Sequence, residues 1–438
     1  MLDLNPETRS KEWTREVVEA ANAKYVDAST IAPVVIISYK RGGNASSIKL
    51  LNNTNVKTYL FVYDDDYENY KNAVENSKNI EVVLCPSAQF RGAAKKRDFV
   101  QETMYNKGFE DYFILDDDIS ALYYTEIGTT KAGSYKAQKV QLDPERFFKT
   151  WYYVIHDLVD YEVTLGGIIA EFASWGQNLY KLPVTDKTGR ICQIMYINAK
   201  KFAENNIKYI EEKSWDDFDV MLQVAHLGLG LSQIRWLTYA GDTMNPNNSV
   251  ASGGDFTWTK KSMRLYQKWG DNVGFKADKG QLNTTINWSK IKKDLQVLGH
   301  LNITYKEEWK KYFALDKEYE NATNDNPYNL DYIGFTELWR PEIEKWLEKH
   351  PQKVKKEKKE ISKEIKEKAH ELVEEAKERG LIKTLDEVTE DDTASLTVPD
   401  NFERDNTIDI VAKYEDDITP LDREVLGDFI DKGDINEL

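Results

Sequence analysis

Cysteine and histidine are scarce in this sequence, which has two cysteines and five histidines among 438 residues. Cys85 and Cys192 cannot build a disulfide framework. C-x-x-C spacing is absent and the histidines are scattered, which excludes a zinc site made of cysteine and histidine. Both cysteines lie in apolar segments, where we expect them to be inert packing residues.

Long apolar runs are also absent. No stretch approaches the roughly 20 apolar residues that a membrane-spanning helix needs. The N-terminal residues, MLDLNPETRSKEW, are polar and lack the apolar core of a signal peptide. These features predict a soluble protein of a reducing compartment, located in the cytoplasm.

The negative charge is concentrated at one end of the chain. Residues 384–438 hold 18 acidic and 4 basic residues, a net charge of −14 out of −16 for the whole chain. The remaining residues are almost neutral, so the overall charge neither excludes nor favours nucleic-acid binding. We expect this acidic segment to regulate the protein or to recruit a basic protein partner, without taking part in chemistry.

Four short apolar runs predict the strands of a parallel sheet. They lie at 34–38, 58–63, 80–84 and 112–115, and a helical pattern follows the third run at 91–106. Continuous apolar runs with connections of this length are typical of buried parallel strands in βα units. The expected fold class is therefore α/β, with a mostly parallel, Rossmann-like sheet flanked by helices.

Polar clusters directly follow three of these runs, at 38–41, 64–66 and 116–118. The carboxyl ends of parallel strands meet at one edge of a sheet, and ligands bind there. We therefore expect the three clusters to converge on one site.

The rest of the chain suggests two appended parts. Residues 1–300 are expected to form the main domain, including a helix at 216–228 and a polar loop at 242–256 of the kind that closes over active sites. Residues 301–383 are expected to form a charged helical extension, and 384–438 an acidic C-terminal segment.

Asp116, Asp117 and Asp118 follow the fourth apolar run and form the strongest candidate for chemistry. Adjacent carboxylates repel one another, and a hard divalent cation relieves that repulsion. Such a cation also neutralises a diphosphate leaving group. A solvated turn is the alternative explanation for an isolated triplet of this kind.

The segment RGAAKKRD, residues 91–98, opens a predicted helix just upstream. A glycine with small residues at a helix N-terminus permits close approach of a phosphate, and the helix dipole favours anions there. Arg91, Lys95 and Arg97 could counter the diphosphate charge. An ordinary basic helix start is the alternative.

Residues 91–119, RGAAKKRDFVQETMYNKGFEDYFILDDDI, resemble the donor-site stretch of GT-A glycosyltransferases. The resemblance implies that Asp116 and Asp118 hold a divalent cation, Mn²⁺ or Mg²⁺, and that Arg97 and Asp98 brace a nucleotide-sugar donor. We expect this donor to be UDP-linked. It implies the following donor-binding residues: Ser38, Lys40, Arg41, Asp64, Arg91, Gly92, Lys95, Arg97, Asp98, Asp116 and Asp117.

A second acidic motif, WDDFDV at 215–220, is similar to the one that supplies the catalytic base in inverting members of these enzymes. Asp216 replaces the usual glutamate, and we expect Asp217 to be the base, with Asp216 as its alternative. A neighbouring carboxylate raises the pKa of a general base usefully. An acidic helix start is the non-catalytic alternative for Asp216, Asp217 and Asp219.

The combination of SYKR, FRGAAKKRD, ILDDDIS, QIMYIN and DDFDVMLQVAHLGLG resembles the phage TET/JBP-associated glycosyltransferases over roughly residues 30–260. That resemblance implies transfer of a sugar to a hydroxymethylated pyrimidine, such as 5-hydroxymethylcytosine, in DNA, in the cytoplasm of an infected cell. A glycosyltransferase with a polysaccharide, protein or lipid-linked acceptor is the alternative. A non-enzymatic relative is disfavoured by the intact Asp116 and Asp118.

Three further residues are weaker acceptor-site candidates: Trp175, Asn178 and Asn247. An indole such as that of Trp175 can stack on a base or a sugar ring, although a core or surface role is equally compatible with the sequence. His226 could be a third metal ligand, but a structural role is favoured.

Overall fold

The computed structural model describes residues 2–129, 135–170, 182–209, 215–241, 257–313 and 329–350. The acceptor candidates Trp175, Asn178 and Asn247 lie outside the described residues, as do the 242–256 loop and everything after residue 350. Among the described residues, no helix combines the length and the apolar character that crossing a bilayer requires.

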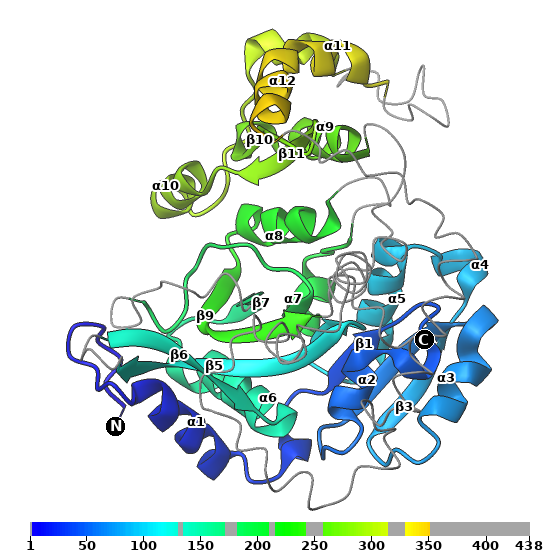
Figure 1. Ribbon diagram of the computed structural model, residues 1–438, viewed down its shortest axis with the longest axis vertical. Helices are drawn as coiled ribbons and strands as arrows, with labels where there is room; N and C mark the ends of the chain where they lie inside the picture. The colour runs from blue at the N-terminus through cyan, green and yellow to red at the C-terminus, as the bar shows by residue number, and fades with distance from the viewer. Residues whose placement is uncertain are drawn as a thin grey trace, which may run out of the picture. The chain divides into compact units, whose positions relative to one another are not determined.

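A nine-stranded sheet forms the centre of the protein, with the strand order β3-β2-β1-β4-β8-β7-β9-β5-β6 (Figure 1). The first four strands in this order are parallel. Their bounds are β1 Val34–Ile37, β2 Thr58–Tyr63, β3 Ile80–Cys85 and β4 Asp111–Asp116. The α/β prediction and the four predicted parallel strands are confirmed.

The other half of the sheet is mixed. β8 runs antiparallel to both β4 and β7, β7 and β9 are parallel, and β5 is antiparallel to β9 and β6. The bounds are β5 Ile119–Thr129, β6 Tyr135–Leu142, β7 Val163–Ala170, β8 Ile194–Asn198 and β9 Gly230–Gly241. The chain leaves β4 through the Asp116–Asp118 turn and crosses the sheet to β5.

Alternating side chains of the parallel strands enter two separate cores, as the two-residue period of a strand requires. Val34 and Ile36 pack in one core and Val35 in the other. The first core is covered by α1 Trp13–Lys24, α2 Ser46–Leu51, α3 Tyr67–Ala73 and α6 Pro144–Tyr153. The second is covered by α5 Ala93–Asn106, α7 Ala199–Glu204 and α8 Asp216–His226.

Local sequence signals explain where several helices begin and end. The Asp143 carboxylate accepts a hydrogen bond from the backbone N–H of Arg146, and Pro144 occupies the first turn of α6. Asn287 caps the start of α10 (Trp288–Leu298) in the same way. Gly299 ends α10 with a left-handed backbone, at φ 76°.

Residues 257–350 add a smaller layer beside α8. It contains α9 Thr257–Trp269, the antiparallel pair β10 Val273–Asp278 and β11 Gln281–Ile286, then α10, α11 Tyr332–Leu338 and α12 Arg340–Lys349. Its centre is a cluster of aromatic rings with centroids 5.0–6.5 Å apart: Tyr266, Phe275, Trp309, Phe313, Phe335 and Trp339.

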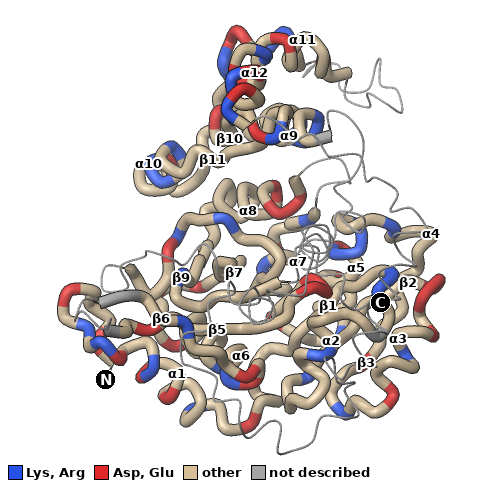
Figure 2. The backbone as a smooth tube through the Cα atoms, in the orientation of Figure 1, with Lys and Arg blue, Asp and Glu red and all other residues tan. Residues whose placement is uncertain are grey.

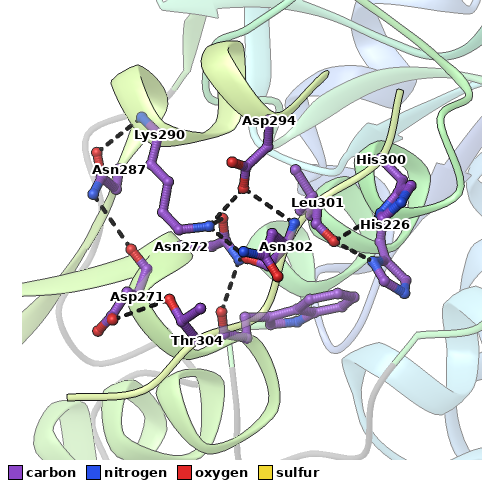
Figure 3. Close-up of polar contacts among 11 residues, drawn as sticks. His226, Asp271, Asn272, Asn287, Lys290, Asp294, His300, Leu301, Asn302 and Thr304 are labelled. Carbon is purple, nitrogen blue, oxygen red and sulfur yellow. Dashed lines mark hydrogen bonds and ion pairs between the residues drawn. The ribbon is translucent and has the colours of Figure 1, made fainter. Parts of the chain in front are cut away.

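A polar network fixes α10 to the segment after it (Figure 3). Lys290 Nζ donates to Asn272 Oδ1 at 3.1 Å and to the Asn302 carbonyl, and it pairs with Asp294. His226 and His300 both contact the carbonyl oxygen of Leu301, at 3.2 and 3.1 Å. His226 therefore joins α8 to this segment, which agrees with the structural role favoured from the sequence.

Candidate active site

The turn at Asp116, Asp117 and Asp118 is fixed by a buried serine of α2. Ser47 Oγ donates to the carbonyl oxygen of Asp116 at 2.6 Å, and its backbone N–H donates to the Asp117 carbonyl at 3.2 Å. Ile119 N–H in turn donates to Ser47 Oγ at 3.0 Å. The backbone of the turn is therefore held rigidly at the carboxyl end of β4, which orients its three side chains.

Asp117 ties this turn to the end of β1. Its carboxylate accepts hydrogen bonds from Ser38 Oγ at 2.5 Å and from the Tyr39 N–H at 3.3 Å, and it pairs with Arg41 Nε at 3.0 Å. Tyr70 supports the same corner, because its hydroxyl contacts Ser38 Oγ at 2.6 Å and accepts from the Arg41 N–H at 3.0 Å. Two of the expected donor residues thus contact Asp117 directly.

Arg97 is the centre of the acidic cluster. Its guanidinium is buried and pairs with Asp116, at 3.1 Å, and with Asp216 at the start of α8. Burial alone would lower the pKa of Arg97, but Asp216 and Asp116 outweigh that effect and raise it. Arg97 therefore remains charged and joins the two acidic motifs that the sequence placed 100 residues apart.

The surroundings of Asp116 disfavour its ionised form. Burial raises its pKa to about 6, with Arg97 opposing the shift and Asp118 adding to it. Placing a positive charge beside Asp116 and Asp118 would relieve this unfavourable arrangement of carboxylates.

The carboxylates of Asp116 and Asp118 fit a hard divalent cation. Within the ranges that the structure describes, no group of three or more histidine, cysteine or acidic side chains forms a ready-made metal cage. A cation such as Mg²⁺ is commonly held by one or two carboxylates together with substrate phosphates and water. Two oxygen ligands on one turn match that mode of binding.

Gly92 adopts a backbone conformation that is essentially restricted to glycine, with φ 113° and ψ 155°. Its N–H donates to the hydroxyl of Tyr63 at 2.9 Å, and that hydroxyl donates to the carbonyls of Phe90 and Gly92. The N-terminus of α5 is thereby fixed to the end of β2.

We expect Gly92→Ala to destabilise the protein by about 1–3 kcal/mol, the usual cost of strain at such a backbone position. Nucleotide binding should weaken as well, because the start of α5 would move away from Tyr63. Thermal melting and a nucleotide titration measure the two effects. Ala93→Ser, an exposed change at the next residue, is the control, and equal melting of the two variants would contradict the prediction.

The other expected donor residues lie around this corner. Arg91 pairs with Asp65 at 3.0 Å and donates to Tyr39 Oη at 3.1 Å, so it joins the ends of β1 and β2. Lys40, with a left-handed backbone at φ 55°, extends over the ring of Tyr39. Asp64 accepts from the Ser87 N–H at 3.2 Å.

Two residues of α5 differ in their surroundings. Lys95, in the first turn, is half-buried. The Asp98 carboxylate accepts a hydrogen bond from the Tyr209 N–H at 2.8 Å, so it fixes the segment after α7. The expected donor role of both residues stays a prediction.

Lys96 is a buried member of the site that the sequence analysis did not single out. Its Nζ donates to the Ser38 carbonyl at 2.6 Å and lies 4.1 Å from the centre of the Tyr63 ring. Burial lowers the pKa of Lys96 to about 8. Lys95, Lys96 and Arg97 are consecutive basic residues, so the sequence does not indicate which of these side chains contacts Ser38.

Asp217 lies in the first turn of α8, beside Asp216, and its side chain is 13 % exposed. Burial raises the pKa of Asp217, and the charge of Asp216 raises it further, while Arg190 opposes the shift. Arg190 Nη2 lies 3.6 Å from the Asp217 carboxylate, and its guanidinium covers the Phe218 ring at 5.1 Å. A carboxylate with a raised pKa suits the role of a proton acceptor.

The segment before β8 completes this side of the site. The Asp116 N–H donates to the Gln193 carbonyl at 2.9 Å, and Tyr239 Oη donates to Gln193 Oε1 at 2.6 Å. Burial raises the pKa of the neighbouring Cys192 thiol, and that of Cys85 to about 11. Both thiols therefore stay protonated near neutral pH.

Asp219 has a structural role, in contrast to Asp216 and Asp217. Its fully buried carboxylate accepts from Trp269 Nε1 at 2.7 Å and from Gln223 Nε2 at 2.6 Å, and it pairs with Lys268 at 2.8 Å. These contacts fix α8 to α9.

We expect Asp219→Ala to lower the free energy of unfolding by about 3 kcal/mol, because the substitution leaves the buried Trp269 N–H without its charged acceptor. Urea unfolding measures this loss. The exposed Glu75→Ala serves as the control, and an unchanged unfolding midpoint for Asp219→Ala would refute the structural role.

The geometry thus brings together the Asp116–Asp118 turn, the buried Arg97 and the acidic start of α8. Residues 32–248 match the TET-Associated Glycosyltransferase family. Over these residues, just under half of the chain, the protein is similar to that family. The protein is therefore a nucleotide-sugar-dependent glycosyltransferase, and the family resemblance drawn over roughly residues 30–260 is confirmed.

Solved structures add only distant similarities to this glycosyltransferase. Glucosyl-3-phosphoglycerate synthase from Mycobacterium tuberculosis, in complex with Mn²⁺, UDP and glucosyl-3-phosphoglycerate, is 11 % identical with a TM-score of 0.34, over 61 % of this chain and 89 % of that one. The inositol-1-phosphate CTP transferase from T. maritima is 10 % identical with a TM-score of 0.31, over 51 % and 93 %. These similarities are too weak to assign a substrate. A comparison with curated proteins finds no match.

Proposed function

We propose that this glycosyltransferase transfers a sugar from a nucleotide diphosphate donor, in a metal-dependent reaction, to the hydroxymethyl group of a modified pyrimidine in DNA. The observation that carries the proposal is Arg97, which pairs with Asp116 on the donor side and with Asp216 on the acceptor side. The similarity to the TET-associated glycosyltransferases supports the proposed acceptor class.

On the donor side, Asp116 and Asp118 would hold a divalent cation, Mn²⁺ or Mg²⁺. When bound, that cation supplies positive charge to the diphosphate as the bond to the sugar breaks. Asp117 keeps the turn in place through Ser38 and Arg41. Arg91, just before α5, adds a positive charge beside the proposed nucleotide site. We also propose that the nucleotide of the donor is UDP.

On the acceptor side, Asp217 would take the proton of the acceptor hydroxyl. The hydroxyl oxygen then bonds to the anomeric carbon of the sugar, and the bond from that carbon to the diphosphate breaks. Burial and Asp216 raise the pKa of Asp217, which increases its affinity for the proton. Arg190 opposes this shift and so favours the ionised form of Asp217, which a general base needs before the reaction.

A matrix of donors and acceptors tests this proposal. UDP-linked and other nucleotide sugars are each incubated with Mn²⁺ and with DNA containing 5-hydroxymethylcytosine, unmodified DNA, a polysaccharide or a protein, and release of the nucleoside diphosphate is measured. We expect release to be stimulated by the hydroxymethylated DNA alone. Stimulation by a polysaccharide or protein, with none by DNA, would overturn the proposed acceptor.

A further inference from the structure

Residues 257–313, the first part of the smaller layer beside α8, are basic, and α8 carries the proposed base. Residues 257–313 contain twelve lysine and arginine residues against five aspartate and glutamate residues, a net charge of +7 in a chain whose total is −16. Figure 2 shows lysine and arginine on α9 and α10 of this layer. A local surface of this sign attracts polyanions despite the acidic total.

Two tryptophans of this region lie next to each other, and each has a lysine beside its ring. Lys261 Nζ lies 5.2 Å from the centre of the Trp215 ring, and the rings of Trp215 and Trp258 are 6.3 Å apart. Lys279 Nζ lies 5.4 Å from the centre of the Trp258 ring. We call these four residues, Trp215, Lys261, Trp258 and Lys279, the Trp–Lys track.

One end of the track reaches the proposed catalytic carboxylates. Trp215 directly precedes Asp216 and Asp217, and its ring lies 6.3 Å from that of Phe218. Arg190, which pairs with Asp217, covers the Phe218 ring. The track therefore begins beside the group expected to meet the acceptor hydroxyl.

The other end lies at the turn between β10 and β11. Lys279 and Gly280 both have positive φ values there, 50° and 75°, as a tight two-residue hairpin turn requires. The Lys279 side chain is exposed at this turn, whereas the two tryptophans are half-buried. Each indole thus has one part anchored in the fold and another part open to solvent.

Hydrogen bonds hold the Trp215 side chain and the Trp258 backbone in place. Trp215 Nε1 donates to Ser262 Oγ at 3.3 Å, and Trp258 N–H donates to Gln281 Oε1 at 3.1 Å. The buried contacts of Asp219 with Trp269 and Lys268 also fix α8 to α9. The Trp215 indole is therefore already positioned before a ligand binds, which lowers the entropic cost of binding.

We propose that the Trp–Lys track binds the DNA strand that carries the acceptor base, which rests on the function proposed above. Bases of an unpaired strand stack on aromatic side chains, while lysines contact the phosphates between them. Two adjacent indole rings with an ammonium group on each side, next to the proposed base, fit that chemistry. Lys261 and Lys279 bind phosphates, and Trp215 and Trp258 stack on bases adjacent to the reacting nucleotide.

The test uses the full-length protein and a fluorescent single-stranded oligonucleotide containing 5-hydroxymethylcytosine, with binding followed by anisotropy over a range of salt concentrations. Lys261→Glu combined with Lys279→Glu is compared with Lys292→Glu combined with Lys293→Glu. The second pair lies exposed on α10, outside the track, and changes the net charge equally.

We expect the track variant to bind at least tenfold more weakly than the wild type. Its salt dependence should also fall, by about 0.7 in the slope of log K against log salt for each lost phosphate contact. The α10 variant should change affinity by less than threefold, and both should melt as the wild type does.

Two results would overturn the assignment of the track. One is a track variant with wild-type affinity, and the other is an α10 variant that loses as much affinity as the track variant, which would show a response to net charge alone. Either result leaves the proposed sugar transfer intact. A wild-type protein that binds no DNA would instead overturn the proposed acceptor, and the track assignment with it.

Discussion

Replacing Asp118 with alanine is expected to abolish sugar transfer while leaving the protein folded. The substitution removes one of the two carboxylates proposed to hold the divalent cation at the end of β4. Charge stabilisation by such a cation is worth several kcal/mol, which corresponds to a loss of about a thousandfold or more in rate. Release of nucleoside diphosphate in the presence of acceptor DNA measures this loss.

The choice of Asp118 avoids a complication at its neighbours. Asp116 pairs with Arg97, and Asp117 holds the end of β1, so their removal would disturb the site in other ways. The exposed Asp160→Ala is a control for loss of an acidic side chain. Full activity of Asp118→Ala, or of the wild type in EDTA, would show that the metal role is wrong.

Asp217→Asn is expected to lower kcat by roughly a hundredfold to ten-thousandfold, the usual contribution of a general base. The amide keeps the size of the carboxylate but cannot take the proton of the acceptor hydroxyl. Because the donor site is built from other residues, the KM for the nucleotide sugar should change little. Steady-state kinetics with acceptor DNA at saturation separate the two quantities.

Asp216→Asn is the matched comparison, since it changes the adjacent carboxylate in the same way. Asp216 pairs with Arg97, so its loss should alter the donor side and stability more than proton transfer. A normal rate for Asp217→Asn together with an inactive Asp216→Asn would assign the base to Asp216.

The parallel half of the sheet could be predicted because its strands carry their own signal. β1, β2 and β4 are continuous apolar runs, and each is followed by polar residues at the carboxyl end. The convergence of those ends is a property of any parallel sheet. The mixed half has no comparable signal, because the crossing from β4 to β5 depends on pairing between residues far apart in the chain.

The same limit applies within the site. The two acidic motifs could be found from the sequence. The ion pairs by which Arg97 connects them, with Asp116 and Asp216, form only in the folded chain. Arg190 lies in a segment without a recognisable motif and approaches Asp217 through the fold. Asp219 looked equivalent to Asp217, and only burial against Trp269 distinguishes it as structural.

Lys96 illustrates how burial decides the role of one residue among similar neighbours. Lys95, Lys96 and Arg97 are consecutive and all basic, yet Lys96 turns toward Ser38 and Arg97 toward the two acidic motifs. A helix presents successive residues about 100° apart, so adjacent residues necessarily face different surroundings.

The most direct test of the account is the mass of the nucleosides recovered after the reaction. DNA containing 5-hydroxymethylcytosine is incubated with the protein, Mn²⁺ and a UDP-sugar, then digested completely and analysed by mass spectrometry. We predict that the hydroxymethylated nucleoside gains the mass of one sugar residue, and that it does not with Asp217→Asn over the same time. Unmodified nucleosides across the full panel of nucleotide sugars would contradict the proposed function.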